Sequence, residues 1–267
     1  MQSKINYQLE TDRILAQLPA ERTPTLFLHA CCAPCSSYVL EYLSRYFAIT
    51  LFFYNPNISP EAEYLHRKAE LCRLVQELPL GNPVTVVDGD YLPERFYALA
   101  KGLEQEPERG ARCQKCIGHR LEETFRAAAA LEVLPDFVCT TLTISPHKDA
   151  VFINTRGAEL AEQYGIPWLP TDFKKKGGYQ RSIVLSREYD LYRQNFCGCV
   201  YSRLEAERRG LKACGIAGLH CENFCKKQLT SFGDCAILVL RALKGTAHFA
   251  EAFCREPLSP AESSGKK

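Results

Sequence analysis

The sequence predicts an α/β protein with a Rossmann-like, doubly wound and mostly parallel sheet, followed by a small helical C-terminal appendage that contains cysteines. Short apolar runs rich in β-branched and aromatic residues alternate with longer helical patterns through residues 1–201, which is the element order of such a sheet. The chain of 267 residues is 46% hydrophobic and 24% charged, so it can bury one substantial core without disulfide staples.

The strands and helices follow one another along the chain. The expected strands are the apolar runs at 25–29, 49–54, 84–87, 137–140 and, shorter, 168–169. The expected helices are an amphipathic one within 1–20 and the patterns at 37–46, 61–78, 120–131 and 150–164. Ser59 is a candidate cap for the third of these helices, and Pro60 fits its first turn. The segments that follow parallel strands, including 31–35, 88–91 and 140–145, are expected to share one crevice.

The composition narrows the cellular setting. The sequence has no basic leader followed by an apolar stretch, and no run approaches the roughly 20 apolar residues of a membrane span, so we expect a cytoplasmic protein with no membrane partner. Thiols stay reduced there, which favours metal ligands or catalytic groups for the 14 cysteines. The net charge of +2 leaves nucleic-acid binding to a local patch such as Lys174, Lys175 and Lys176, unless those lysines form an ordinary solvated loop.

Two Cys-x-x-Cys segments carry the strongest chemical signal. Cys32 and Cys35, with Cys31 beside them, follow the first strand, and Cys113 and Cys116 open a later helix. A thioredoxin-type dithiol would use Cys32 and Cys35 alone, and a zinc ribbon would place its two halves closer together in the sequence. Both alternatives stay open. Four or five thiols from separate loops of one crevice favour an iron–sulfur cluster, and Cys35 can then bind a second metal, relay electrons or pack.

A third cysteine segment is Cys197-Gly198-Cys199. The glycine permits the distorted backbone of a very small disulfide ring, and strained disulfides are readily reduced. The pair therefore suits a redox role, with two buried or metal-binding cysteines as the alternative. The chain has neither a Gly-x-Gly-x-x-Gly segment after a strand nor a Gly-x4-Gly-Lys-Ser/Thr loop, so neither a bound dinucleotide nor a P-loop is expected.

The pattern changes after residue 201. A charged helix is expected from Ser202, then a loop with Cys214, Cys221, Cys225 and Cys235, an apolar helix at 236–243 and a polar tail. We therefore expect a catalytic α/β domain with a metallocluster over 1–201, a helical cysteine-rich extension over 202–258 and a disordered tail over 259–267. The four cysteines of the extension either bind a metal or stay reduced and partly buried.

Motifs in order along residues 20–205 resemble the QueH family of cobalamin-independent epoxyqueuosine reductases. The matching segments are 28–36, 52–58, 88–91, 102–116, 140–148, 172–177 and 192–202. The resemblance implies that the chain reduces the epoxide of epoxyqueuosine to queuosine at the wobble position of tRNA, the last step of queuosine biosynthesis. It also implies a [4Fe-4S] cluster bound by Cys31, Cys32, Cys113 and Cys116, together with a redox-active pair at Cys197 and Cys199.

The resemblance further implies a mononuclear iron beside the cluster, for which Cys35 and Asp90 match a cysteine and an aspartate ligand. Removal of an epoxide oxygen needs two electrons, a centre that takes up oxygen and a proton source. Asp90, Tyr91 and His29 lie at or after predicted strand ends and are candidate proton donors. A histidine in such a place is more often an interior residue, and an aspartate more often a helix cap.

A base at the wobble position is recognised by stacking and edge contacts, and its phosphates by basic groups. Lys174, Lys175, Lys176, Tyr179 and Arg193 are the candidate tRNA-binding residues, and an electron donor of unknown identity is the other expected partner. The alternative interpretation is an RNA-binding module with a four-cysteine zinc site and no catalysis. A nucleotide-dependent tRNA sulfur transferase ranks last, because cysteines occupy the place of its phosphate loop.

Overall fold

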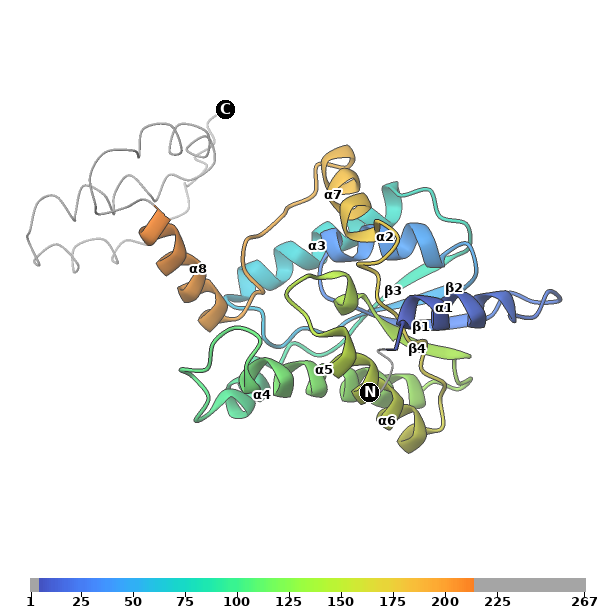
Figure 1. Cartoon of the computed structure of the whole chain (residues 1–267), viewed down its shortest axis with the longest axis horizontal. Coiled ribbons are helices and arrows are strands. Elements are labelled where there is room, and N and C mark those ends of the chain that lie inside the picture. Colours follow the sequence, from blue (N-terminus) through green and yellow to red (C-terminus); the bar gives the residue numbers. More distant parts are fainter. Residues whose placement is uncertain (1–4, 214–267) are drawn as a thin grey trace, which may run out of the picture. The chain divides into compact units, whose positions relative to one another are not determined.

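The computed structural model describes residues 5–213 and confirms the predicted α/β class (Figure 1). Within these residues the sheet has four strands: β1 (Thr25–Ala30), β2 (Ala48–Phe53), β3 (Val84–Asp88) and β4 (Phe137–Thr140). All neighbouring strands are parallel, in the order β3-β2-β1-β4, so the four longer strand predictions are confirmed. The predicted short strand at 168–169 is reduced to a single bridge between Val138 and Trp168.

Helices cover both faces of this sheet (Figure 1). The helices are α1 (Tyr7–Ala16), α2 (Ala33–Leu43), α3 (Glu61–Glu77), α4 (Pro93–Ala100), α5 (Ala111–Ala129), α6 (Ala150–Tyr164), α7 (Gly178–Glu188) and α8 (Val200–Ala213). A short 3-10 helix, η1 (Thr141–Ile144), follows β4 directly. Helices α2, α3 and α7 lie on one face and α5 and α6 on the other, which is the doubly wound arrangement that the alternation predicts.

Burial on both faces explains the continuous apolar sequence of the strands. Successive side chains of β1 point to opposite faces. Leu28 packs on one face of the sheet, in the same core cluster as Leu40 of α2. Phe27 packs on the other face, in the same core cluster as Leu121 and Phe125 of α5.

β1 lies where the order of the strands reverses. The chain runs outward from β1 through β2 to β3 and then returns to place β4 on the other side of β1. Such a switch point opens a crevice at the carboxyl ends of the strands, where ligands of this fold bind. The segment 31–35 follows β1 at this point and η1 follows β4. The backbone N–H of Cys31 donates to Thr141 Oγ1 at 3.3 Å and joins the two segments.

Two helix starts and one helix cap differ from the sequence prediction. α2 begins at Ala33, before the predicted start at Ser37, because Pro34 is in its first turn, where the fixed φ of proline suits a helix and no N–H is needed. α3 begins at Glu61 as predicted, but its N-cap is Pro60 and not Ser59. α5 begins at Ala111, so the helix predicted at 120–131 is its second half.

Two helices, α4 and α7, form where no helix is predicted. α4 has eight residues, of which Phe96 and Ala100 are buried. α7 follows Gly177, whose φ of 74° is in the left-handed region that favours glycine. Its one large buried apolar side chain is Leu185. Both helices bury too few apolar residues for periodicity to reveal them.

The compact unit that contains the sheet ends at Glu207, and α8 covers the start of the region predicted as an extension over 202–258. The cysteines predicted there as metal ligands or reduced thiols (Cys214, Cys221, Cys225 and Cys235) lie outside the described residues. The predicted helix at 236–243 and tail at 259–267 lie outside them too. In the part of the chain that the structure describes, no helix is both long and apolar enough to cross a membrane.

Candidate metal centre and redox site

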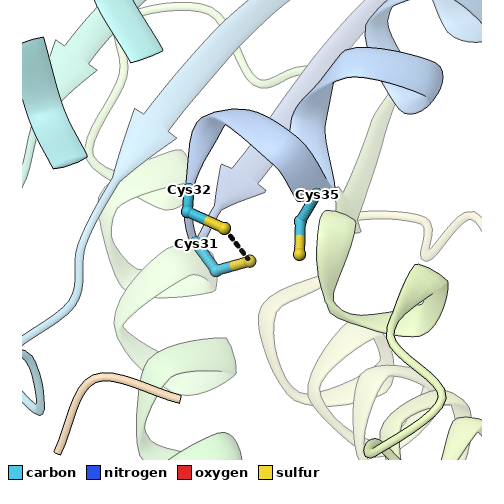
Figure 2. A group of neighbouring side chains, drawn as sticks. All are labelled: Cys31, Cys32 and Cys35. Carbon is cyan, nitrogen blue, oxygen red and sulfur yellow. Dashed lines mark hydrogen bonds between the residues drawn. The ribbon is translucent and has the colours of Figure 1, made fainter. Parts of the chain in front are cut away.

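Three cysteines gather where β1 meets α2. The Sγ atoms of Cys31, Cys32 and Cys35 all lie within 4.8 Å of one another, and those of Cys31 and Cys32 are 3.9 Å apart. Figure 2 shows the three sulfurs turned toward a common point. Cys32 is the extended N-cap of α2 (φ −172°, ψ 166°) and Pro34 stands in the first turn, so neighbouring residues present their thiols to the same side. The group can hold a metal ion.

Hydrogen bonds among these thiols place the negative charge on Cys32. The bonds from Cys31 and Cys35 hold the pKa of Cys32 well below its ordinary value, with help from the charge of Arg67. The bond with Cys32 raises the pKa of Cys31 to about 12. Cys32 also stands at the N-terminus of α2, where the helix dipole favours a negative charge. A thiolate is the form that binds metal, so the donors fit an iron or zinc centre.

A second group of four cysteines surrounds a small cavity. Cys113 and Cys116 come from the N-terminal part of α5, and Cys197 and Cys199 lie just before α8. The wall of the cavity includes Cys113, Cys116, Cys197, Cys199, Arg120 and Lys148. Burial raises the pKa of Cys116 to about 11. With Arg112 also in its wall, the cavity combines soft sulfur ligands with three basic side chains.

Arg120 is the residue that relates the two cysteine groups. It lies one helical turn after Cys116 on the same face of α5, and its side chain is 2% exposed. Burial acts to lower the pKa of Arg120, but the nearby thiols of Cys116, Cys197, Cys31 and Cys113 raise it. Sulfurs from the loop after β1 and from α5 thus act on one buried guanidinium.

Hydrogen bonds fix Arg120 against the sheet. Its Nη1 donates to Asn55 Oδ1 at 3.2 Å, and Asn55 Nδ2 donates to the carbonyl of Ala30 at 2.9 Å. Ala30 is the last residue of β1, directly before Cys31. This chain of contacts ties α5 to the carboxyl end of β1, which directly precedes the first cysteine group.

The two cysteines of the Cys-Gly-Cys segment have different environments. Lys148 Nζ donates to Cys197 Sγ at 3.1 Å. Burial acts to raise the pKa of Cys197, but the charges of Lys148 and Arg120 lower it below its ordinary value. Burial raises the pKa of Cys199, whose Sγ accepts from the backbone N–H of Ser202 at 3.4 Å. Both thiols are free in the structure, and Cys197 is the one more ready to ionise.

The backbone of this segment needs its glycine. Gly198 has φ 126°, and a methyl group there would lie 3.0 Å from both Arg67 Nη1 and Ile58 Cγ1. Arg67 Nη1 donates to the carbonyl of Cys197 at 2.9 Å, and Ser59 N donates to that of Gly198 at 3.0 Å. The segment is held closely against the loop after β2 and against α3.

His29 is an interior residue. It is fully buried, with Nδ1 bonded to Thr140 Oγ1 at 2.9 Å and Nε2 to the carbonyl of Tyr54 at 3.0 Å. Burial lowers the pKa of His29 to about 3, so the ring is neutral at physiological pH. It joins β1 to its neighbours and is poorly suited to deliver a proton.

Asp90 and Tyr91 lie in the segment after β3. Tyr91 donates its hydroxyl to the carbonyl of Ile58 at 2.8 Å and stacks on Tyr64 with ring centroids 4.1 Å apart. Asp90 is exposed, and among the described residues its carboxylate does not join the group of Cys35 and its neighbours. The structure therefore gathers Cys35, but not Asp90, with the cysteines that follow β1.

The predicted basic patch is partly neutralised. Lys174 pairs with Asp172 at 2.8 Å and Lys176 with Asp12 at 2.6 Å. Lys175 is exposed, and no hydrogen bond or ion pair of its side chain is found within the described residues. Of the three lysines, it is the one best placed to meet a phosphate.

The other two predicted nucleic-acid residues lie together near α7. The guanidinium of Arg193 stands 5.9 Å from the centroid of the Tyr179 ring, within the range of a cation–π contact. Arg193 is exposed and Tyr179 half-buried. This pair offers an aromatic face and a positive charge side by side.

Arg120 and Lys148 are functional candidates that sequence reasoning misses. Arginine and lysine are usually exposed, so neither residue suggests a buried site. The one signal in the sequence is spacing, because Arg120 follows Cys116 by four residues and Lys148 ends the segment that follows β4.

Comparison with known proteins agrees with this geometry. Residues 26–205 match the family model of epoxyqueuosine reductase QueH. The chain is 43% identical to epoxyqueuosine reductase QueH of Streptococcus pyogenes serotype M1, covering 74% of this chain and 78% of that protein. It is 41% identical to epoxyqueuosine reductase QueH of Staphylococcus epidermidis, covering 76% of this chain and 86% of that protein. It is 35% identical to epoxyqueuosine reductase QueH of Thermotoga maritima, covering 69% of this chain and 93% of that protein. The matched region contains all the cysteines of both groups, and the chain belongs to the QueH family of epoxyqueuosine reductases.

Proposed function

We propose that this chain reduces the epoxide of epoxyqueuosine in tRNA to the alkene of queuosine, as a cytoplasmic enzyme with an iron–sulfur cluster. The observation that carries the proposal is the placement of the cysteines: three thiols lie within 4.8 Å of one another after β1, and four more line one cavity with Arg120, which is hydrogen-bonded through Asn55 to the end of β1. The family match supports the same activity. A wobble nucleotide is the substrate, and tRNA and an electron donor are the partners.

The reaction sets the requirements for the site. Both carbon–oxygen bonds of the epoxide break, a carbon–carbon double bond forms, and the oxygen leaves as water after uptake of two electrons and two protons. Oxidation of a dithiol to a disulfide releases that number of electrons and protons. Cys197 and Cys199 are the proposed redox pair, with Cys197 as the more reactive thiol because of Lys148.

Four cysteines would hold the cluster. Cys31 and Cys32 at the end of β1 and Cys113 and Cys116 on α5 offer thiolates from two sides of the crevice, as a [4Fe-4S] cluster requires. Such a cluster supplies electrons one at a time when bound. Cys35 lies within 4.8 Å of Cys31 and Cys32 and is the proposed protein ligand of a mononuclear iron beside it.

Three residues are candidates for the proton donor, and one of them, Asp90, is also the candidate second ligand of that iron. His29 and Tyr91 both have their polar atoms engaged in the interior. Asp90 is exposed and free of those contacts, so it remains the candidate for proton delivery or for an iron that binds together with substrate.

One observation favours a second function. The tight group of Cys31, Cys32 and Cys35 has the spacing of ligands to a single ion, and zinc prefers thiolates in such a group. A zinc-binding RNA module without catalysis is therefore the competing assignment.

The test is turnover by the protein purified without oxygen. tRNA that carries epoxyqueuosine is incubated with the protein and a low-potential one-electron reductant, and the nucleosides are analysed by mass spectrometry. We expect a product that lacks one oxygen atom, formed by the wild type and by Cys72→Ala, a cysteine of α3 outside both groups. The Cys197→Ser variant is expected to lose this activity. Tight tRNA binding without turnover by the wild type would instead support the zinc module.

A further inference from the structure

Two buried polar side chains in the wall of the cavity at Cys197 carry atoms that have no hydrogen-bond partner in the described part of the chain. Arg120 is 2% exposed and Asn57 1% exposed, and both form part of the cavity wall. Nη1 of Arg120 is bonded to Asn55, but within residues 5–213 its Nε and Nη2 have no hydrogen-bond partner, and neither has Oδ1 of Asn57. Side chains of the cavity wall therefore carry two unpaired N–H donors and one unpaired acceptor, which come from different elements.

Such atoms point to a ligand. Buried polar groups in native proteins are almost always hydrogen-bonded, and the exceptions mark strain, function or a missing partner. Asn57 and Arg120 are far apart in the sequence, on the loop after β2 and on α5, yet face one cavity. Their free atoms suit a ligand with an oxygen that accepts hydrogen bonds and a neighbouring group that donates one.

Arg112 also lines this cavity, and its terminal nitrogens have structural partners. It is equally buried, but its Nη1 donates to the carbonyls of Leu103, Glu104 and Glu106, and its Nη2 donates to Glu205. The terminal nitrogens of Arg112 are thus used to hold a loop and α8 in place. Nε lacks a partner in both arginines within residues 5–213, and only Arg120 also has an unpaired terminal nitrogen, Nη2, in a side chain that lines the cavity with Cys197 and Lys148.

We infer that Arg120 and Asn57 bind the epoxide-bearing part of the substrate. Nε and Nη2 of Arg120 donate to the epoxide oxygen, and Oδ1 of Asn57 accepts from a hydroxyl or ammonium group beside it. This inference rests on the proposed function and identifies the atoms that recognise the reacting group.

The chemistry explains why a guanidinium suits this place. When the first carbon–oxygen bond breaks, the oxygen gains negative charge, and it leaves as water once two protons and two electrons from the reductant have been taken up. Preorganised donors in a site shielded from water stabilise such charge strongly. Arg120 remains charged among the cysteines, because the nearby thiols favour its protonated form.

The N–H donors of Arg120 would also suit the sulfide atoms of a cluster. Bonds to the epoxide oxygen and bonds to a sulfide have different effects that can be measured. Bonds to the epoxide oxygen act on turnover and leave the metal content unchanged. Bonds to sulfide change the iron content, the visible absorption or the reduction potential of the protein before any substrate is added.

The experiment uses anaerobically purified full-length protein with epoxyqueuosine-containing tRNA. Arg120→Lys keeps the positive charge and removes Nε and Nη2, and Asn57→Leu keeps the size of the side chain and removes the acceptor. Arg73→Lys is the matched control, since the guanidinium of Arg73 is bonded to Glu70 and Glu77 on the surface of α3. Iron content, absorption spectrum and reduction potential are recorded for each variant before kcat and KM.

We expect Arg120→Lys to lower kcat by about 100-fold or more, the effect of removing a transition-state donor, with iron, potential and KM for tRNA unchanged. Asn57→Leu should lower kcat/KM, and Arg73→Lys should match the wild type. Added guanidinium ion should restore part of the activity of Arg120→Ala, which a purely structural role would not allow.

Two results would overturn the inference. If Arg120→Lys has the wild-type kcat per iron, the N–H donors of Arg120 do not contact the substrate. If the variant instead has a shifted reduction potential, or loses iron in parallel with activity, those donors belong to the cluster. A wild type that never converts epoxyqueuosine is a separate outcome, because it removes the proposed function itself and with it this site.

Discussion

Lys148 distinguishes Cys197 from Cys199. Its ammonium lies 3.1 Å from the sulfur of Cys197, whereas Cys199 bonds with Ser202 at the start of α8. A thiolate is the reactive form of cysteine, so the lysine makes Cys197 the more reactive thiol of the proposed pair. A positive charge in the cavity also attracts any oxygen that becomes negative there.

Replacement of Lys148 by Met tests this selection. The Lys148→Met variant keeps the length of the side chain and removes its charge, so the pKa of Cys197, which Lys148 holds below its ordinary value, should rise. The thiolate would then form only at higher pH, and alkylation of Cys197 by iodoacetamide should be slower at neutral pH. Mass spectrometry of the labelled peptide across neutral and alkaline pH gives the rate.

Lys174→Met is the control, because Lys174 pairs with Asp172 and does not contact the cysteine pair. It should leave the labelling profile of Cys197 as in the wild type. An identical profile in Lys148→Met would mean that the lysine does not control the thiol.

At the scale of single residues, sequence reasoning finds the cysteines and misses their partners. Cys31 and Cys113 are evident because closely spaced cysteines after a strand or at the start of a helix are typical of metal ligands and redox pairs. Arg120 and Asn57 are not evident, because their importance comes from burial and from atoms left without partners. Only packing of α5 against the end of β1 produces those features.

At the scale of elements, α5 organises the site. Cys113, Cys116 and Arg120 follow one another at helical spacing, so they share one side of this helix, and α5 packs on β1 and β4 as well as on α6. Ile117 and Leu121 anchor it in the core. Any change in how α5 or α6 packs would therefore move two proposed ligands.

Two glycines in these helices test the packing. Gly157 of α6 lies against the ring of Trp168, and an added methyl group would overlap that ring, whereas nothing lies within 4 Å of a methyl group added to Gly118 of α5. Gly157→Ala should lower the free energy of unfolding by about 1–3 kcal/mol, the usual cost of overpacking. Gly118→Ala should raise it by about 0.5–1 kcal/mol, since alanine favours a helix. Urea unfolding followed by circular dichroism measures both.

Equal stability of the two variants would contradict the arrangement of α6 against Trp168.

The element order itself is predictable from the sequence, because apolar runs and periodic segments alternate. The start of α2 and the short helices α4 and α7 are not, since Pro34 extends α2 toward Cys32 and the short helices bury few apolar side chains. These departures matter, because the early start of α2 makes Cys32 its N-cap.

At the scale of the whole molecule, the proposed recognition of tRNA depends on local charge. The net charge is +2, and most cations of the predicted patch have acidic neighbours. Lys175 is free of such pairs within the described residues, and Arg193 with Tyr179 offers a charged stacking surface. The patch is therefore smaller than its sequence suggests.

Reversal of charge tests the patch. Lys175→Glu should weaken tRNA binding and reduce the dependence of log K on log salt by about one phosphate contact, and reversal of Lys176 as well should weaken it further. Arg156→Glu on α6, with the same change in net charge, should bind tRNA as the wild type does. Filter binding at several salt concentrations measures the affinity, and iron content should be the same in all variants. Unchanged affinity in the double variant would remove this patch from the interface.

The metal content of protein purified without oxygen tests the central claim most directly. The account predicts about four irons and four acid-labile sulfides per chain, lost in the Cys113→Ala/Cys116→Ala variant and retained in Cys72→Ala, a cysteine outside both groups. An absorption spectrum of the same samples reports the intact cluster. About one zinc per chain and no sulfide would contradict the reductase account and support the RNA-binding module.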